Sequence, residues 1–224
     1  MDVKEIVPTF MYPTEAMDGA IVSGNCVSAC DKNPTYIHAN SPVIMDLLAQ
    51  HGKTINFLGC VITNENVTLM DKERSSNQTA KLVQFLGADA AVISEEGFGN
   101  PDADLVMNCN KIEKMGIKTV LITDEYAGQD GASQSLADST PLGDACVTAG
   151  NANQVVTLEK MDTVIGYPEV ANVIAGGWGA PQTLPDGTVV AASAQPDGSI
   201  VTEIQAITSA TNELGYHFLT AKTI

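Results

Sequence analysis

The sequence predicts an α/β fold, with a mostly parallel sheet of about five strands flanked by helices and a small β-hairpin region near the C-terminus. Two observations support this fold class. After residue 40, apolar strand-like runs alternate with helical segments of about 10 to 15 residues, which is the pattern of βαβ units. Nearer the C-terminus, Pro-Asp-Gly turns at 185–187 and 196–198 flank the short run TVVAASA, which favours hairpins.

The predicted helices begin at capping residues or prolines and end at glycines, as helices commonly do. Three are expected, from Ser41-Pro42 to Gly52, from Ser76 to Leu86 before Gly87, and from Asn100-Pro101 to Gly116. Thr202 is expected to cap a last helix that ends at Gly215.

The predicted strands are apolar runs short enough for a sheet that is covered on both faces. They are expected at Ile55–Thr63, Ala90–Ser94, Thr119–Thr123, Ala145–Gly150 and Val173–Gly177. Because helical segments connect most of them, the sheet is expected to be mostly parallel.

Composition narrows the possible partners and the compartment. The chain has 27 acidic and 11 basic residues and a net charge of −16, which would repel phosphate backbones and anionic lipids. We therefore expect no nucleic-acid partner and no membrane partner. No secretory signal and no run of about 18 apolar residues is present. Five cysteines are an odd number without the spacing of a disulfide framework, so the predicted location is the cytoplasm.

Acidic residues follow the predicted strands at the sheet edge where α/β proteins bind ligands. Carboxylates suit an ammonium group, and a tryptophan ring can face a cation. The candidate substrate-binding residues are Glu95, Glu96, Asp124, Glu125 and Trp178. The alternative is that these acids cap helices or face solvent.

Cys26 and Cys30 form a second candidate. Their spacing allows a redox dithiol, a pair of metal ligands or two packed thiols, although no complete zinc ligand set is evident and we expect no metal. Cys26 also follows the small, flexible stretch Ser23-Gly24-Asn25. A bent backbone there would let the thiol attack the preceding carbonyl. Elimination of sulfur and hydrolysis would then leave a ketone at a new chain terminus, which can act as an electron sink.

Long words around these residues resemble a known family. GNCVSACDKNPTYIHANSPVI, TNENVTLMDKERSSNQTAKLVQFLGAD, ISEEGFGNPDADLVMNC and VLITDEYAGQDGASQSLAD are similar to component B of the glycine, sarcosine and betaine reductases, and the resemblance runs from about Ile6 to the C-terminus. It implies that a pro-protein cuts itself between Asn25 and Cys26, and that Cys26 becomes a covalent pyruvoyl group. The chain would then divide into an N-terminal arm, 1–25, and a single α/β domain, 26–224.

The resemblance also implies a mechanism and partners. The substrate amine would condense with the carbonyl derived from Cys26 to give an imine, and a selenol would then cleave the C–N bond reductively. The implied partners are the upstream half of the pro-protein, a selenocysteine-containing component B subunit, a small component carrying a thiol or selenol, and a component that forms acetyl phosphate. Two alternatives stay open: a non-catalytic α/β binding or scaffold module with Cys26 unprocessed, and a pyruvoyl subunit like that of proline reductase.

Overall fold

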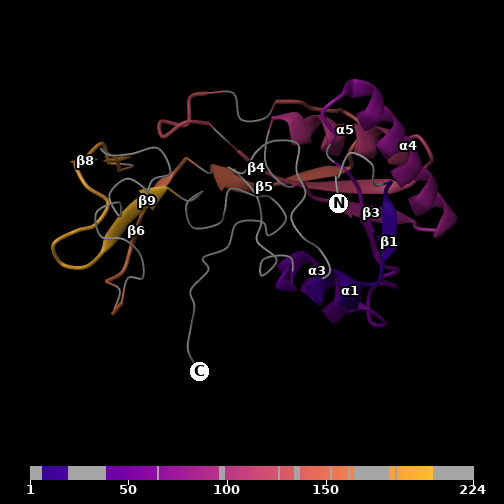
Figure 1. Ribbon diagram of the computed structural model, residues 1–224, viewed down its shortest axis with the longest axis horizontal. Helices are drawn as coiled ribbons and strands as arrows, with labels where there is room; N and C mark the ends of the chain where they lie inside the picture. Colours follow the sequence, from indigo (N-terminus) through magenta and orange to yellow (C-terminus); the bar gives the residue numbers. More distant parts are fainter. Residues whose placement is uncertain are drawn as a thin grey trace. The chain divides into compact units, whose positions relative to one another are not determined.

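The computed structural model describes residues 7–19, 39–64, 66–95, 99–125, 127–133, 137–151, 153–160, 162–163, 182–184 and 186–203 (Figure 1). They fall into two compact units. Within the described part, the first unit holds the residues up to Thr123 together with 137–149, and the second holds 124–133 and 150–203. The expected boundary between residues 25 and 26 lies outside the described residues, so the predicted division into an arm and one domain stays a prediction.

A three-stranded sheet confirms the predicted α/β class. Its order is β3 (Ala90–Ile93), β4 (Lys118–Glu125) and β5 (Ala145–Asn151). β3 and β4 are parallel, with Ala90 opposite Lys118. β5 runs the same way, because the Asp144 amide at its start donates to the Thr119 carbonyl at the start of β4, at 3.0 Å. The described sheet therefore has three strands and not the five that were predicted.

The run Ile55–Thr63 explains part of this difference. Only β2 (Cys60–Ile62) is extended, and it pairs antiparallel with β1 (Thr9–Met11) in a separate two-stranded sheet. Gly59 makes the pairing possible: at φ 148° it lies so close to Phe10 that a Cβ would meet the ring at 2.4 Å. The prediction of a strand in this run is therefore correct only for its last part, and the assignment to the parallel sheet was wrong, because its partner strand comes from the N-terminal segment. The fifth candidate, Val173–Gly177, lies outside the described residues.

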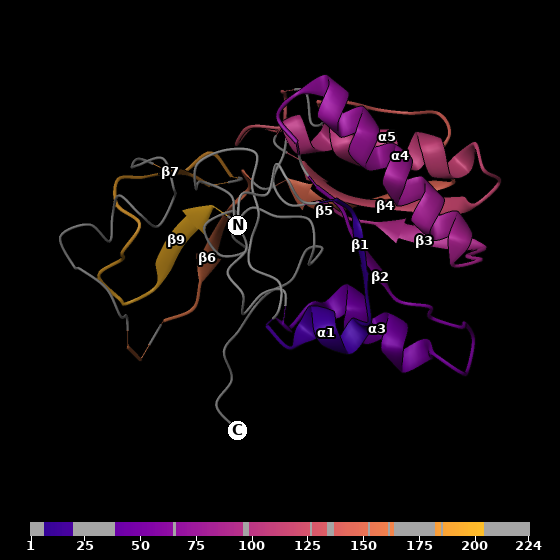
Figure 2. The same ribbon diagram turned by 45° about the vertical axis from the view of Figure 1, so that its right-hand side comes forward.

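Helices α4 (Leu69–Phe85) and α5 (Asn100–Glu113) pack together on one face of the sheet (Figure 2). Residues from both helices and from β3 and β4 form the core of the first unit, which contains Ala80, Val83, Ile93, Leu105, Cys109, Ile112, Ile117 and Leu121. α5 begins at Asn100 as predicted, with Pro101 in its first turn, and the chain turns at Gly116 with φ 81°.

The start of α4 differs from the prediction. It begins at Leu69 and not at Ser76, because the Thr68 hydroxyl accepts from the Asp71 amide at 3.2 Å and caps the helix there. The first turns bury Lys72, Ser75 and Ser76. A polar buried face gives no apolar periodicity, so the pattern revealed only the second half of the helix.

Helix α3 (Pro42–Gln50) matches its prediction, since the Ser41 hydroxyl accepts from the Ile44 amide at 3.4 Å. A short helix, α1 (Pro13–Met17), precedes it and was not predicted. No described helix is both long enough and apolar enough to cross a membrane.

The second unit is built of antiparallel pairs. β6 (Val155–Leu158) pairs with β9 (Ile200–Glu203), and β7 (Gln182–Thr183) pairs with β8 (Val189–Val190). The β7–β8 hairpin confirms the predicted hairpin region. Thr202 was expected to cap a helix, and this was wrong. It lies in β9 opposite Val156, because the β-branched run Ile200-Val201-Thr202 extends against β6.

Candidate substrate site

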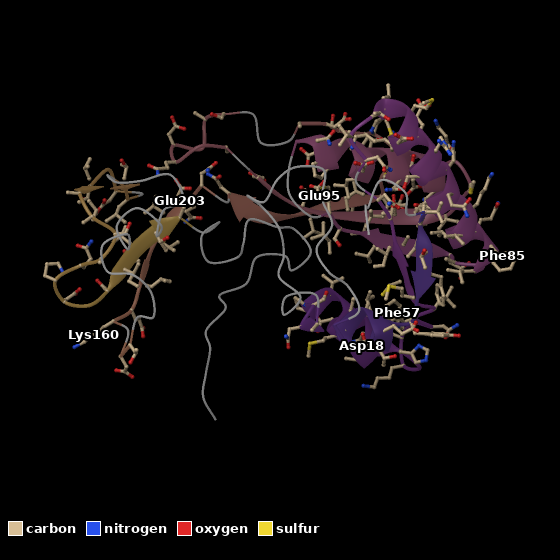
Figure 3. All side chains as sticks on the ribbon, in the orientation of Figure 1. Asp18, Phe57, Phe85, Glu95, Lys160 and Glu203 are labelled. Atoms are coloured by element: carbon tan, nitrogen blue, oxygen red, sulfur yellow. The ribbon has the colours of Figure 1, made fainter. Side chains whose placement is uncertain are left out.

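Glu95 lies two residues after β3 and is buried, with 5% of its surface exposed. Its Oε1 accepts a hydrogen bond of 3.1 Å from the Thr123 hydroxyl on β4, and Thr123 is 1% exposed. The carboxyl ends of parallel strands meet at one edge of a sheet, which brings together two residues far apart in the chain. Figure 3 shows Glu95 in the first unit. Of the predicted substrate-binding residues, Glu95 is the one whose side-chain contact the structure defines.

The loop that starts at Glu95 returns to α5 at a fixed point. Gly99, at φ 77°, donates its amide to Asp102 Oδ2 at 3.0 Å. The same oxygen accepts from the Ala137 amide at 2.9 Å, which ties a second loop to the start of α5. Glu95 and Gly99, the described residues on either side of 96–98, are therefore each held by a side-chain hydrogen bond.

A buried ion pair joins α4 and α5. Lys72 on α4 pairs with Asp104 on α5, and its Nζ also donates to the Asn100 carbonyl at 3.1 Å. Burial raises the pKa of Asp104 to about 6, and the hydrogen bond from Lys72 opposes part of that rise. The sequence analysis missed this pair. The sequence does contain a sign of a polar buried helix face. Polar residues recur there at helical spacing, at positions that an ordinary amphipathic helix would fill with apolar side chains: Lys72, Ser75, Ser76 and Thr79.

Asp124 and Glu125 were predicted to lie in a loop after a strand that ends at Thr123. They are the last two residues of β4, which is longer than expected. They belong to the second unit, whereas Glu95 belongs to the first. Their grouping with Glu95 in one site therefore stays a prediction.

The other site residues named from the sequence cannot be placed. Asn25, Cys26, Cys30, Glu96 and Trp178 all lie outside the described residues. The origin of the pyruvoyl group in Cys26 therefore stays a prediction.

The second unit contains a polar cluster that sequence reasoning did not identify. Asn151, at the end of β5, accepts from the Ala127 amide at 3.1 Å and donates to the Gly128 carbonyl at 2.8 Å. Asn153 accepts from the Gly128 amide at 3.0 Å. Glu203, which is 4% exposed, accepts from Gln129 Nε2 at 2.8 Å (Figure 3). These side chains hold the loop after β4, and their spacing in the sequence gives no sign that they meet.

Two of the described thiols, Cys60 and Cys109, are poor nucleophiles or metal ligands. Burial raises the pKa of Cys60 to about 11 and also raises the pKa of Cys109, so both stay protonated near neutral pH. Within the described ranges, no three His, Cys, Asp or Glu side chains converge as a metal site requires. The chemistry that this part of the chain offers is a buried carboxylate with a fixed hydroxyl donor.

Comparison with known proteins gives a consistent picture. The family model of the glycine/sarcosine/betaine reductase component B subunits matches residues 1–222. Glycine reductase complex component B subunits alpha and beta of Acetoanaerobium sticklandii is 62% identical over 100% of this chain and 50% of its own length. Two proteins of Peptoclostridium acidaminophilum match 99% of this chain and 49% of their own length. They are the sarcosine reductase complex component B subunit alpha, at 50% identity, and the betaine reductase complex component B subunit alpha, at 39%.

The chain thus spans about half the length of the curated relatives it matches. No solved structure matches it. The family match covers nearly every residue, including Asn25-Cys26 and the acidic loop at Glu95. This chain belongs to the glycine/sarcosine/betaine reductase component B subunits.

Proposed function

We propose that this chain is the pyruvoyl-bearing subunit of an amino-acid reductase complex, with the pyruvoyl group formed from Cys26 after cleavage behind Asn25. The ketone would activate the substrate amine as an imine, so that a partner selenoprotein can cleave the C–N bond reductively. The observation that carries the proposal is the family match over residues 1–222, which spans Asn25-Cys26.

The residues of the chain are compatible with such a group. A free amino acid near pH 7 carries mostly an ammonium group, which has no electron pair with which to attack a ketone. Glu95 offers a buried carboxylate at the edge of a parallel sheet, where it can hold the ammonium and accept its proton. In this proposal Glu96, Asp124, Glu125 and Trp178 complete the substrate site.

The relatives favour glycine as the substrate. Identity falls from 62% with the glycine reductase protein to 50% with the sarcosine and 39% with the betaine reductase protein. Betaine also has a quaternary nitrogen that cannot form an imine, so a betaine-specific subunit would use a carbonyl differently. The proposed partners are the upstream half of the pro-protein, the selenocysteine-containing subunit, the small thiol or selenol carrier and the component that forms acetyl phosphate.

The intact mass of the chain tests the proposal. Protein purified from the active complex should be cut between Asn25 and Cys26, and the larger fragment should begin with a ketone and lack the sulfur of Cys26. Cys26→Ala should abolish both cleavage and activity, since no thiol remains to attack the preceding carbonyl. Cys30→Ala is the matched control and should still be cut.

An uncut chain with an intact Cys26, taken from an active complex, would contradict the proposal. That result would favour the non-catalytic binding or scaffold module. A cut chain that supports turnover of proline, and of no glycine, sarcosine or betaine, would favour a subunit like that of proline reductase.

A further inference from the structure

We infer that Thr123 is a positioning residue, whose hydroxyl fixes the Glu95 carboxylate as the acceptor for the ammonium group of the substrate. The inference rests on the proposed function and adds to it which carboxylate holds the amine and what orients that carboxylate. It also limits the substrate to small molecules whose ammonium group carries an N–H bond and can give a proton to Glu95.

The geometry around Glu95 is the first argument. A glutamate has three side-chain torsions, and fixing them costs conformational entropy. Thr123 lies in the body of β4, is β-branched and is 1% exposed, so its hydroxyl has little freedom of direction. The 3.1 Å hydrogen bond to Oε1 therefore transfers the rigidity of the sheet to a side chain in a loop.

The start of α5, which follows Glu95 in the chain, is also fixed by side chains. Beyond Glu95, the chain is fixed again where the Gly99 amide meets Asp102 and where Lys72 holds the Asn100 carbonyl. A carboxylate anchored to the neighbouring strand in this way keeps its place when a ligand binds. Preorganised groups of this kind lose less freedom on binding than mobile ones.

A hydrogen bond between a threonine and a glutamate does not identify a ligand site by itself, because a second such pair lies at the other end of β4. Thr119 is buried on the same face of the strand and donates to Glu113 Oε1 at 2.6 Å. Thr119 and Glu113 lie at the amino end of the strand, and ligands of open α/β sheets bind at the carboxyl end. The two pairs have the same chemistry, so Thr119 is a matched control for Thr123.

In the inferred step, the substrate ammonium gives one proton to the Glu95 carboxylate. The N–H bond breaks, its electron pair stays on nitrogen, and the carboxylate becomes a neutral acid. The Thr123 hydroxyl keeps donating to Oε1 throughout and exchanges no proton. No oxidant, reductant or metal takes part.

The test measures glycine binding and not activity. The full chain is treated with borohydride beforehand, so that any ketone is reduced and no covalent adduct forms, and labelled glycine is then bound by equilibrium dialysis. Thr123→Val removes the hydroxyl at nearly constant size, and Thr123→Ser keeps it. We expect T123V to weaken binding about tenfold, the size of one lost hydrogen bond to a charged group. T123S and the control Thr119→Val should bind as the unaltered chain does.

A double variant separates positioning from a general structural effect. Glu95→Gln should weaken binding at least as much as T123V, and adding T123V to E95Q should cause no further loss, because the hydroxyl acts through the carboxylate. If T123V does not fold, Glu95→Asp withdraws the carboxylate from Thr123 by one methylene, and it should weaken binding to a similar extent.

Unchanged binding by T123V, or by E95D if that variant replaces it, would overturn the inference. An equal loss from T123V in the presence and absence of Glu95 would overturn it as well. The proposed function fails separately: a chain whose intact mass before borohydride treatment shows an uncut, unmodified Cys26, and which still shows the expected order of binding, would refute the processing and leave the role of Thr123 in place.

Discussion

Asp104 carries its carboxyl group inside the interface of α4 and α5, where its side chain is 5% exposed and that of Lys72 is 4% exposed. Two buried charges are costly to desolvate, and their attraction repays that cost only in part. The raised pKa of Asp104, about 6, reflects this balance. The same lysine donates a hydrogen bond to the Asn100 carbonyl, so it links α4 to the start of α5.

The titration of Asp104 tests this description of the buried pair. Its carboxyl ¹³C resonance should titrate with a midpoint near pH 6, about two units above an ordinary aspartate. Because the folded state binds this proton more tightly than the unfolded state, the contribution of Asp104 to the free energy of unfolding is present below about pH 4 and is lost as the pH rises through about 6.

Asp104→Asn is the control, since it keeps the shape of the side chain and removes the titration. The difference in unfolding free energy between the unaltered chain and D104N should vary with pH between about 4 and 6. A midpoint near pH 4, or a difference that does not depend on pH, would show that the pair is hydrated in solution. The exposed pair of Lys118 and Asp144 offers a comparison in which no such buried carboxyl exists.

At the scale of elements, the pairing of β1 with β2 depends on one glycine. β1 comes from the N-terminal segment, and Phe10 packs directly over Gly59. The backbone of Gly59, at φ 148°, is also a conformation that other residues rarely adopt. The absence of a side chain and the unusual backbone angle serve the same contact.

Gly59→Ala should therefore loosen the β1–β2 pair. The added Cβ would lie 2.4 Å from Phe10 Cε2 and 2.9 Å from the Met11 carbonyl oxygen. We expect overpacking to lower the free energy of unfolding by roughly 1–3 kcal/mol. Hydrogen exchange of the amides in Thr9–Met11 and Cys60–Ile62 measures the effect, and exchange there should accelerate more than in β3.

Gly52→Ala is the matched control for this element. Gly52 also has a positive φ, 73°, but no atom lies within 4 Å of its would-be Cβ. This change should lower the free energy of unfolding only by the cost of the backbone conformation, about 1–2 kcal/mol. The β1–β2 amides should keep their protection from exchange. Equal acceleration of β1 exchange in both variants would mean that contact with Phe10 plays no part.

At the scale of the whole molecule, the described chain forms two compact units with different architectures. A helix-covered parallel sheet forms the first, and antiparallel pairs form most of the second. The chain also spans about half the length of the curated relatives it matches, and those relatives are named as components of reductase complexes.

The prediction at this scale concerns substrate choice in the assembled complex. With the selenoprotein partner and the downstream components added, glycine should be turned over faster than sarcosine, and sarcosine faster than betaine, following the order of identity to the relatives. Product formation from each substrate at equal concentration measures this. A complex containing Cys26→Ala is the control for background turnover, and a preference for betaine would contradict the expectation.

Local signals were sufficient for much of the fold. Ser41 caps α3 through its hydroxyl, prolines stand in the first turns of α3 and α5, and the chain turns at Gly87 and Gly116 with positive φ. β3 lies between α4 and α5, β4 and β5 follow α5, and all three contain runs of apolar and β-branched residues. Each signal lies within a few residues of its effect, so no knowledge of the distant chain is needed. The family resemblance depends on the same contiguous words.

Tertiary structure alone decided the contacts between distant segments. The hydrogen bond from Thr123 to Glu95 joins residues 28 positions apart, and Gln129 and Glu203 meet across 74. The sequence could place acids near the sheet edge, but not select Glu95 among them or name its partner. The choice of β1 as the partner of β2, and the polar face that begins α4, were also decided at this level. The reason is physical: a helix cap or a turn is satisfied by its neighbours, whereas a buried polar group needs a partner, and only packing determines which one.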